Sequence, residues 1–388
     1  MTTIAVVVTA RASFARVQTV IEGLMQRGAN VELILAGSAT LPKFGRVAED
    51  PWFADGKVHR LLDLGAARSR AAVWLHVHEL AAAEPISEVG ASHFVAQLIG
   101  ELTTFLTTVP PVDTLVVVAD RYETVAASLV AAHLKIRLVH LLGGEQSGNI
   151  DNKMRDVNTA LADLHFTATH RARKRVARIC RDESARIFNF GCPSVDLALR
   201  APSPDPAVLK AHGVGFDFEP DEPYVVGLYH PTPADPPSTV EALFNATVEV
   251  ARERNLSVLW FWPNIDPGQH EIARFLRHKH EAGLVPVRFY RNLPPETFLG
   301  LVRGARALVG NSSIGVREAA VLGTPVVNVG RRQFGREVAE NVLTCGTEAA
   351  HLASVIRAAA NSLPYPPSFL YGDGSAGERI AERILDHE

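Results

Sequence analysis

The chain alternates short runs of β-branched residues with longer amphipathic stretches, and this alternation limits the available folds more than any other feature. Residues 3–8 (TIAVVV) are followed by a helical pattern from residue 14 to residue 27 and then by residues 30–37 (NVELILAG). The same order returns over residues 113–144. Continuous apolar strands separated by helices are typical of a parallel sheet covered on both faces. We therefore predict an α/β fold whose ligands bind outside the carboxyl ends of the strands.

A proline-rich segment divides this alternation into two series. Residues 201–223 contain five prolines and several acidic residues, the composition of a linker, and a second series of strand and helix patterns begins at residue 224. With 388 residues, the chain is also longer than a single core usually becomes. We predict two Rossmann-like domains with a cleft between them, over residues 1–200 and 201–370. A terminal helix within residues 371–388 is expected to return to the first domain.

The net charge and the cysteine content limit the cellular compartment and the classes of partner expected for the chain. The formal net charge is −3, which gives no reason to expect nucleic acid or an anionic membrane as a partner. No run of 18 apolar residues occurs, and residues 1–17 lack a cationic leader before their apolar segment. Three cysteines without metal-ligand spacing argue against a structural zinc and against a disulfide framework. We expect a cytoplasmic protein without a metal.

The stretch GNSSIGVREAAVLGTPVVNVG, residues 310–330, predicts a strand that ends at Val309 and a helix from about Ile314 to Leu322. Ser312 and Ser313 would then lie at the helix start, where hydroxyls and free backbone N–H groups can bind phosphate. Simple helix capping by serine explains the same pattern. No Walker-type Gly-Lys-Ser/Thr follows.

The second series offers further polar groups, one within this predicted helix and the others at strand ends. Glu318 could accept both hydroxyls of a ribose, although a solvent-facing charge is an equal alternative. The loop GRRQFGRE, residues 330–337, supplies arginines whose guanidinium groups suit phosphate oxygens, among them Arg332. His230 and Asn264 each end an apolar run. His230 is a candidate phosphate contact, with a purely structural role as the alternative.

Candidate acid/base groups belong to the first series. Asp120 and Arg121 lie where a strand gives way to a helix, and Glu145, Asp151 and Arg155 follow the next strand. Four-residue spacing lets Asp151 and Arg155 share a helix face and fix each other's geometry. Converging carboxylates suit proton abstraction and return, because one group takes a proton while another gives it. Helix capping by Asp120 and Asp151 is the structural alternative.

Taken together and in order, these stretches resemble the hydrolysing UDP-N-acetylglucosamine 2-epimerases. This family includes the bacterial enzymes of sialic and legionaminic acid synthesis and the epimerase half of the animal bifunctional epimerase/kinase. The matching segments are TARASF, ADRYE, HLLGGEQSGNIDNKMRD, HPT, PNIDPG, GNSSIGVREAAVLGTPVVNVGRRQFGRE and YGDG. The resemblance implies a GT-B-like fold, no cofactor, and a homodimer or homotetramer.

The resemblance also implies a reaction and a role for each candidate residue. The family removes the C2 proton of the sugar, eliminates UDP to give a 2-acetamidoglucal, and adds water to release N-acetylmannosamine. UDP would be held by His230, Asn264, Ser312, Ser313, Glu318 and Arg332. The sugar would face Asp120, Glu145, Asp151 and Arg155, with Asp120 and Asp151 as proton-transfer groups and Arg11 and Arg121 as anion stabilisers.

Five positions depart from the family pattern, all of them in the half expected to face the sugar. Phe14 stands where tyrosine is usual, and Arg16 stands where lysine is frequent. Ser13 stands where an acidic residue is usual, Ala39 replaces a histidine, and Leu142 replaces a glutamate or histidine. Three alternatives therefore stay open beside the hydrolysing epimerase. They are a GT-B-type glycosyltransferase, a non-hydrolysing epimerase, and a catalytically altered nucleotide-sugar-binding homologue.

Overall fold

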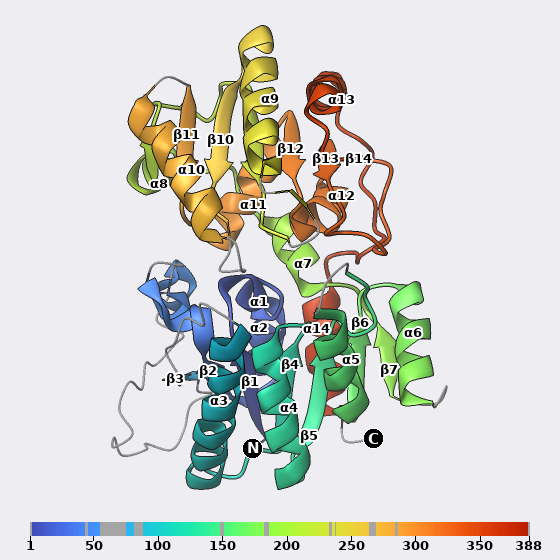
Figure 1. The fold of residues 1–388 in the computed structure, drawn as a ribbon. Coiled ribbons are helices and arrows are strands. Elements are labelled where there is room, and N and C mark those ends of the chain that lie inside the picture. Colours follow the sequence, from blue (N-terminus) through green and yellow to red (C-terminus); the bar gives the residue numbers. More distant parts are fainter. Residues whose placement is uncertain are drawn as a thin grey trace. The chain divides into compact units, whose positions relative to one another are not determined.

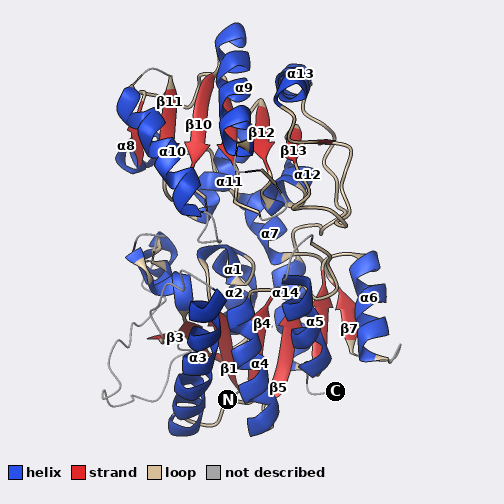
Figure 2. Ribbon diagram, viewed as in Figure 1, coloured by secondary structure: helices blue, strands red, loops and turns tan. Residues whose placement is uncertain are grey.

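The computed structural model describes residues 2–42, 46–54, 75–80, 88–147, 151–181, 186–232, 235–236, 238–263, 269–283 and 286–386. Contacts divide the chain into two compact units. Unit 1 comprises Met1–Glu145, Asn149–Asp196 and Gly372–Glu388. Unit 2 comprises Gln146–Gly148 and Leu197–Tyr371. Each unit is built on its own sheet (Figure 2).

Unit 1 contains a seven-stranded parallel sheet in the order β3-β2-β1-β4-β5-β6-β7. Its strands are β1 Thr3–Val8, β2 Asn30–Leu35, β3 Leu75–Glu79, β4 Thr114–Val118, β5 Arg137–Leu141, β6 Leu164–Thr167 and β7 Ile187–Asn189. The central strands β1 and β4 are buried along their whole length, which accounts for their unbroken apolar sequence.

Helices cover both faces of this sheet (Figure 1). The helices are α1 Arg11–Ala15, α2 Gln18–Gln26, α3 Glu88–Thr108, α4 Tyr122–Leu134, α5 Asp151–Leu161, α6 His170–Cys180 and α14 Ala376–Leu385, and short 3₁₀ turns are η1 Gly37–Thr40, η3 Val47–Glu49 and η4 Pro51–Ala54. α3 packs beside α4, and α4 beside α5, while α2 packs against α14. Ala5 and Val7 of β1 join α3 and α4 in one core.

Unit 2 repeats this layered design with a sheet in the order β14-β13-β12-β9-β10-β11-β8, in which β8 alone runs antiparallel to its neighbour. Its strands are β8 Gly213–Gly215, β9 Tyr224–Leu228, β10 Ser257–Phe261, β11 Val287–Tyr290, β12 Ala307–Gly310, β13 Val326–Val329 and β14 Val342–Cys345. Its helical elements are α8 Pro206–His212, α9 Thr239–Arg254, α10 Gln269–Ala282, α11 Pro295–Gly304, η5 Ser313–Gly315, α12 Glu318–Leu322 and α13 Ala349–Asn361; α7 Pro193–Arg200 spans the boundary between the units.

The predicted α/β class with two Rossmann-like sheets is confirmed. Two predicted helices are interrupted. The expected helix over residues 14–27 is divided into α1 and α2, and the one expected over 314–322 is the turn η5 followed by the five-residue α12. Among the described residues, no helix combines the length and apolar character needed to cross a bilayer.

The C-terminal helix α14 is fixed to unit 1 by a carboxylate from another helix. Asp196 of α7 accepts hydrogen bonds from the backbone N–H groups of Ala376 (3.1 Å) and Gly377 (2.7 Å), and from Oγ1 of Thr19 (3.1 Å). The first N–H groups of a helix have no partner within the helix, so an outside acceptor is needed. A side chain on Gly377 would overlap Thr19, which explains glycine at this close approach to α2.

Replacing Asp196 with alanine should destabilise unit 1, because two buried N–H groups lose a charged acceptor. The expected loss in free energy of unfolding is about 2 kcal/mol, measured by urea titration followed by tryptophan fluorescence. Glu378→Ala is the matched control, since that carboxylate is 71% exposed and only pairs with Arg27 at 3.2 Å. The two variants should differ clearly; equal stabilities would contradict the role of Asp196.

Candidate active site

The strand order of the first sheet reverses between β1 and β4. β2 and β3 continue the sheet on one side of this point, and β5, β6 and β7 continue it on the other. In α/β sheets, ligands bind at the carboxyl ends of strands beside such a switch point. Arg11 follows β1, and Asp120 and Arg121 follow β4. Three of the sequence-predicted residues therefore lie at the expected edge.

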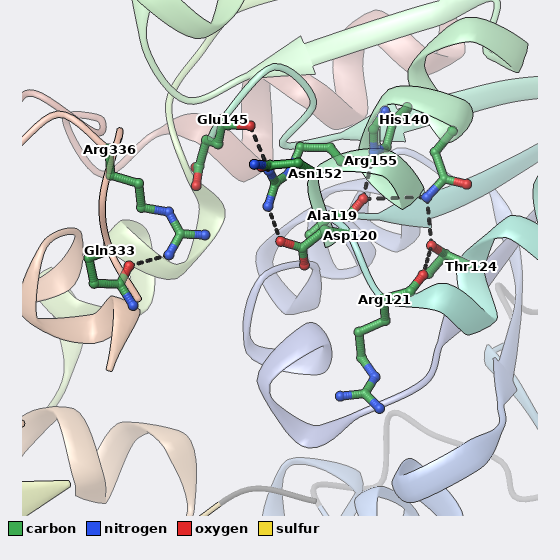
Figure 3. A network of polar contacts seen from close by, with 11 residues as sticks. Ala119, Asp120, Arg121, Thr124, His140, Glu145, Asn152, Arg155, Gln333 and Arg336 are labelled. Carbon is green, nitrogen blue, oxygen red and sulfur yellow. Dashed lines mark hydrogen bonds and ion pairs between the residues drawn. The ribbon is translucent and has the colours of Figure 1, made fainter. Parts of the chain in front are cut away.

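Asp120 forms an ion pair with Arg155 of α5 (Figure 3). The Arg155 guanidinium also donates to the backbone oxygen of Glu145 at 2.5 Å and to Oδ1 of Asn152 at 3.0 Å. Arg155 is only 1% exposed, and a buried guanidinium needs such partners to offset its lost hydration. The structure thus brings together Asp120, Glu145 and Arg155.

Asp151 begins α5 and shares a helix face with Arg155, as the four-residue spacing requires. The spacing predicted Asp151 as the group that fixes Arg155. The carboxylate that the structure pairs with Arg155 is instead Asp120, 35 residues earlier in the chain. A contact between a loop and a helix so far apart leaves no local pattern. Asp120 does not cap α4 either, because the N-cap residue of that helix is Arg121.

Each arginine predicted as an anion stabiliser already has a carboxylate partner. Arg11 Nη2 lies 2.8 Å from Oδ2 of Asp50, and burial lowers the pKa of Arg11 while it raises the pKa of Asp50. Arg121 binds the buried Glu123 through Nε and Nη2, at 3.0 and 2.8 Å. Asp50 and Glu123 were missed by sequence reasoning. The glutamate two residues after Arg121 could have indicated the Arg121–Glu123 pair from the sequence. No local pattern indicated that Asp50 would pair with Arg11.

The backbone at this edge holds two residues in the left-handed region. Ala119, directly after β4, has φ of 61°, and Leu142, directly after β5, has φ of 63°. Both are buried. Residues other than glycine seldom adopt this conformation, and such strain tends to gather at functional sites. One of the two is the leucine that departs from the family pattern.

The second sheet has its own switch point, between β9 and β12. His230 follows β9, and Asn311 follows β12. The side chain of Asn311 joins the two loops, because its Oδ1 accepts from the backbone N–H of His230 at 2.7 Å and its Nδ2 donates to the His230 oxygen at 2.8 Å. Asn311 belongs to the stretch of residues 310–330 that contains Ser312 and Ser313, called the serine motif below, but it was not predicted as a site residue from the sequence.

The backbone oxygen of Asn311 is a second point of attachment. It accepts from Nε2 of Gln333 at 2.7 Å and from Nη1 of Arg332 at 3.3 Å. Gln333 in turn accepts a hydrogen bond from Arg336 (Figure 3). The arginine loop after β13 is therefore tied to the serine motif after β12.

Asn264, the other residue predicted at a strand end of unit 2, lies outside the described residues.

Ser312 and Ser313 lie at the start of η5 and are both partly exposed. The Ser312 hydroxyl makes no capping hydrogen bond, so capping does not explain that serine. Gly310, the first residue of the motif, has φ of 146°, and a Cβ there would lie 1.9 Å from the Leu228 oxygen. Glu318 begins α12 and is only 4% exposed, so the solvent-facing alternative for this carboxylate is wrong.

Two buried histidines, one in each unit, have lowered pKa values. Burial, together with the charge of Arg332, lowers the pKa of His230 well below its usual value. In unit 1, burial lowers the pKa of His140, on β5, to about 3. Neutral imidazoles can each donate one hydrogen bond and accept another, but they add no positive charge. Arg332 therefore supplies the cationic group beside His230.

Comparison with known proteins matches the chain to 2-epimerases that are named for UDP-sugars. The family model described as UDP-N-acetylglucosamine 2-epimerase matches residues 76–385. UDP-N,N'-diacetylbacillosamine 2-epimerase (hydrolyzing) of Legionella pneumophila is 31% identical over 288 residues, which cover 74% of this chain and 74% of that protein. UDP-N-acetylglucosamine 2-epimerase of Neisseria meningitidis serogroup B is 28% identical over 71% of this chain and 72% of that protein.

A solved structure shares the fold over the full length. The complex of Methanocaldococcus jannaschii UDP-GlcNAc 2-epimerase with UDP-GlcNAc and UDP aligns with a TM-score of 0.75, at 17% identity, covering 100% of each chain.

Acidification should destabilise the protein through its buried histidines. Because the pKa of His140 is about 3 when folded and about 6.5 when unfolded, its contribution is complete above pH 6.5 and declines as pH falls toward 3. Between pH 7.5 and pH 5 the loss is about 2 kcal/mol. Urea titrations across this range should show a shallower pH slope for His140→Asn than for the wild type. Equal slopes would mean that folding does not lower the pKa of His140.

Proposed function

Because the chain belongs to the UDP-N-acetylglucosamine 2-epimerase family, we propose that it is a hydrolysing nucleotide-sugar 2-epimerase. Its substrate is UDP-N-acetylglucosamine or a close derivative. Its products are UDP and the 2-epimeric, mannosamine-type sugar. One observation carries the proposal: the switch point of one sheet holds a carboxylate beside a buried arginine, and the loops at that of the other hold an arginine and two serines, groups that suit an anion.

The nucleotide would bind to unit 2. The Ser312 and Ser313 hydroxyls, the first N–H groups of η5 and the Arg332 guanidinium are all donors that suit a diphosphate. Asn311 supports this set from behind by fixing the backbone of His230 and accepting from Arg332. The buried Glu318 carboxylate, at the start of α12, suits the two hydroxyls of the ribose.

The chemistry would be carried out by unit 1. A carboxylate removes the C2 proton, the C2–H electron pair forms the C1–C2 double bond, and UDP leaves with the C1–O electron pair. Water then adds its oxygen to C1 of the glucal while a carboxylate takes one of its protons, and the C1–C2 π pair takes a proton at C2 on the opposite face. We assign Asp120 and Asp151 to proton transfer, with Glu145 facing the sugar. Arg155 anchors Asp120, while Arg11 and Arg121 act as anion stabilisers.

The substituents on the sugar differ between the substrates for which the relatives are named. The two relatives above are named for different sugars, one with a single acetamido group and one a diacetylated bacillosamine. Ala39 and Leu142 replace polar residues of the family pattern and are both buried in unit 1. Both UDP-sugars therefore belong in the assay.

The direct test is incubation of the purified protein with each UDP-sugar in deuterated water, followed by NMR. We expect release of UDP together with a 2-epimeric free sugar that carries deuterium at C2. An epimerised product still bound to UDP would indicate a non-hydrolysing epimerase. UDP release only with an added acceptor and without deuterium would indicate a glycosyltransferase. Intact substrate without exchange for both sugars would contradict epimerisation.

Substitutions in the two units should have separable effects. Asp120→Asn should abolish turnover because the amide cannot accept the C2 proton, yet calorimetry should find UDP affinity within a few-fold of the wild type. Ser312→Ala combined with Ser313→Ala should weaken UDP binding by about 1 to 3 kcal/mol. Retained UDP binding by Asp120→Asn also shows that the variant is folded. Full activity in Asp120→Asn would refute its assignment.

A further inference from the structure

The backbone that carries Asp120 is strained and depends on outside support. Ala119, immediately before Asp120, adopts φ of 61°, a conformation that costs an L-residue with a side chain about 1 kcal/mol or more. Its backbone N–H donates to the Leu141 oxygen at 2.9 Å, which continues the β4–β5 ladder. Its carbonyl oxygen is buried and points to side chains, not to another strand. The side chains that bind this oxygen therefore stabilise the backbone conformation of Ala119.

His140 is the principal support of this carbonyl. Its Nε2 lies 2.9 Å from the Ala119 oxygen (Figure 3). Its Nδ1 lies 3.1 Å from Oγ1 of Thr159 on α5. A carbonyl oxygen only accepts, so Nε2 must carry the proton. A neutral ring then leaves Nδ1 as an acceptor, which the Thr159 hydroxyl fills as donor. The tautomer follows from the partners alone.

The other side of Asp120 is held in a similar way. The Thr124 hydroxyl donates to the Arg121 oxygen at 2.6 Å, and the same hydroxyl accepts from Nδ2 of Asn158 at 2.6 Å. Asn158 Nδ2 also lies 3.5 Å from the Ala119 oxygen. The carbonyls before and after Asp120 are therefore both fixed by buried side chains.

One face of α5 supports the whole arrangement. Arg155, Asn158 and Thr159 are three and four residues apart, so they project from the same side of the helix. Arg155 binds the Asp120 carboxylate, Asn158 binds Thr124, and Thr159 binds His140. The backbone around residue 120 and the carboxylate of Asp120 are thus both held in place by side chains of one helix, α5.

We propose that His140 is a positioning residue for the reaction: its Nε2–H, held by Thr159, fixes the Ala119 backbone and so the direction in which the Asp120 carboxylate points. The inference rests on the proposed function, because it gives Asp120 a part in proton transfer. His140 itself transfers no proton. It is completely buried, and both of its ring nitrogens are occupied.

Two substitutions separate the two bonds of the ring. Glutamine places its amide nitrogen near the position of Nε2, so His140→Gln keeps the donor to Ala119. Asparagine reaches only the position of Nδ1, so His140→Asn keeps the contact with Thr159 and loses the one with Ala119. His165→Asn is the matched control. His165 lies beside His140 on the neighbouring strand β6, is also buried, and hydrogen-bonds to Cys180 at 3.4 Å instead of the Asp120 turn.

Turnover of the UDP-sugar tests the proposal, with wild-type turnover measured first as the separate test of the proposed function. A carboxylate misplaced by about 1 Å costs on the order of 100-fold in rate, so kcat of His140→Asn should fall at least ten-fold while KM and UDP affinity change little. His140→Gln and His165→Asn should stay within a few-fold of the wild type. Wild-type kcat in His140→Asn would overturn the proposal, as would an equal loss in all three variants.

A second measurement does not depend on activity. Long-range ¹H–¹⁵N NMR of the wild-type protein labelled at histidine, assigned with the His140→Asn variant, reports the ring tautomer. We expect a neutral Nε2–H ring at pH 7 that does not titrate down to pH 5. An Nδ1–H tautomer at pH 7 would show that His140 does not donate to Ala119 and would overturn the proposal even if the enzyme is active.

Discussion

The buried ion pair between Arg155 and Asp120 is the constraint around which unit 1 is arranged. Arg155 has almost no contact with solvent, so its charge is tolerated only while Asp120, Asn152 and the Glu145 oxygen remain in place. Removing one partner of a buried pair leaves an uncompensated charge and is far more costly than removing an exposed one. The pair thereby ties the loop after β4 to the loop after β5 through α5. In the proposed reaction, the same bond holds the carboxylate that moves a proton.

In unit 2, neutral side-chain hydrogen bonds join the two loops at the switch point. Asn311 joins the loops after β9 and β12 through neutral hydrogen bonds to the His230 backbone, and its own oxygen anchors the arginine loop after β13. The difference suits the proposed division of labour. A seat for a diphosphate requires donors and net positive charge, whereas proton transfer requires a carboxylate whose position is fixed.

The sequence predicted the layers and the strand ends well because both have local causes. The apolar run of residues 3–8 is the strand β1 itself, and His230 and Asp120 each follow a strand as expected. Helix continuity was harder to predict, since the breaks after Ala15 and after Gly315 lie within stretches of helical pattern. The pairings of Arg11 with Asp50 and of Arg155 with Asp120 span 39 and 35 residues. No spacing rule reaches that far, so these partners emerge only from the fold.

The central claim is that the switch point of unit 2 seats the diphosphate while that of unit 1 presents Asp120 to C2 of the sugar. A crystal structure of the Asp120→Asn variant with intact UDP-N-acetylglucosamine tests it most directly. The account predicts the diphosphate against Ser312, Ser313 and Arg332, with C2 about 3 to 4 Å from the residue 120 side chain. A diphosphate seated elsewhere, or a C2 proton that faces away from residue 120, would contradict it.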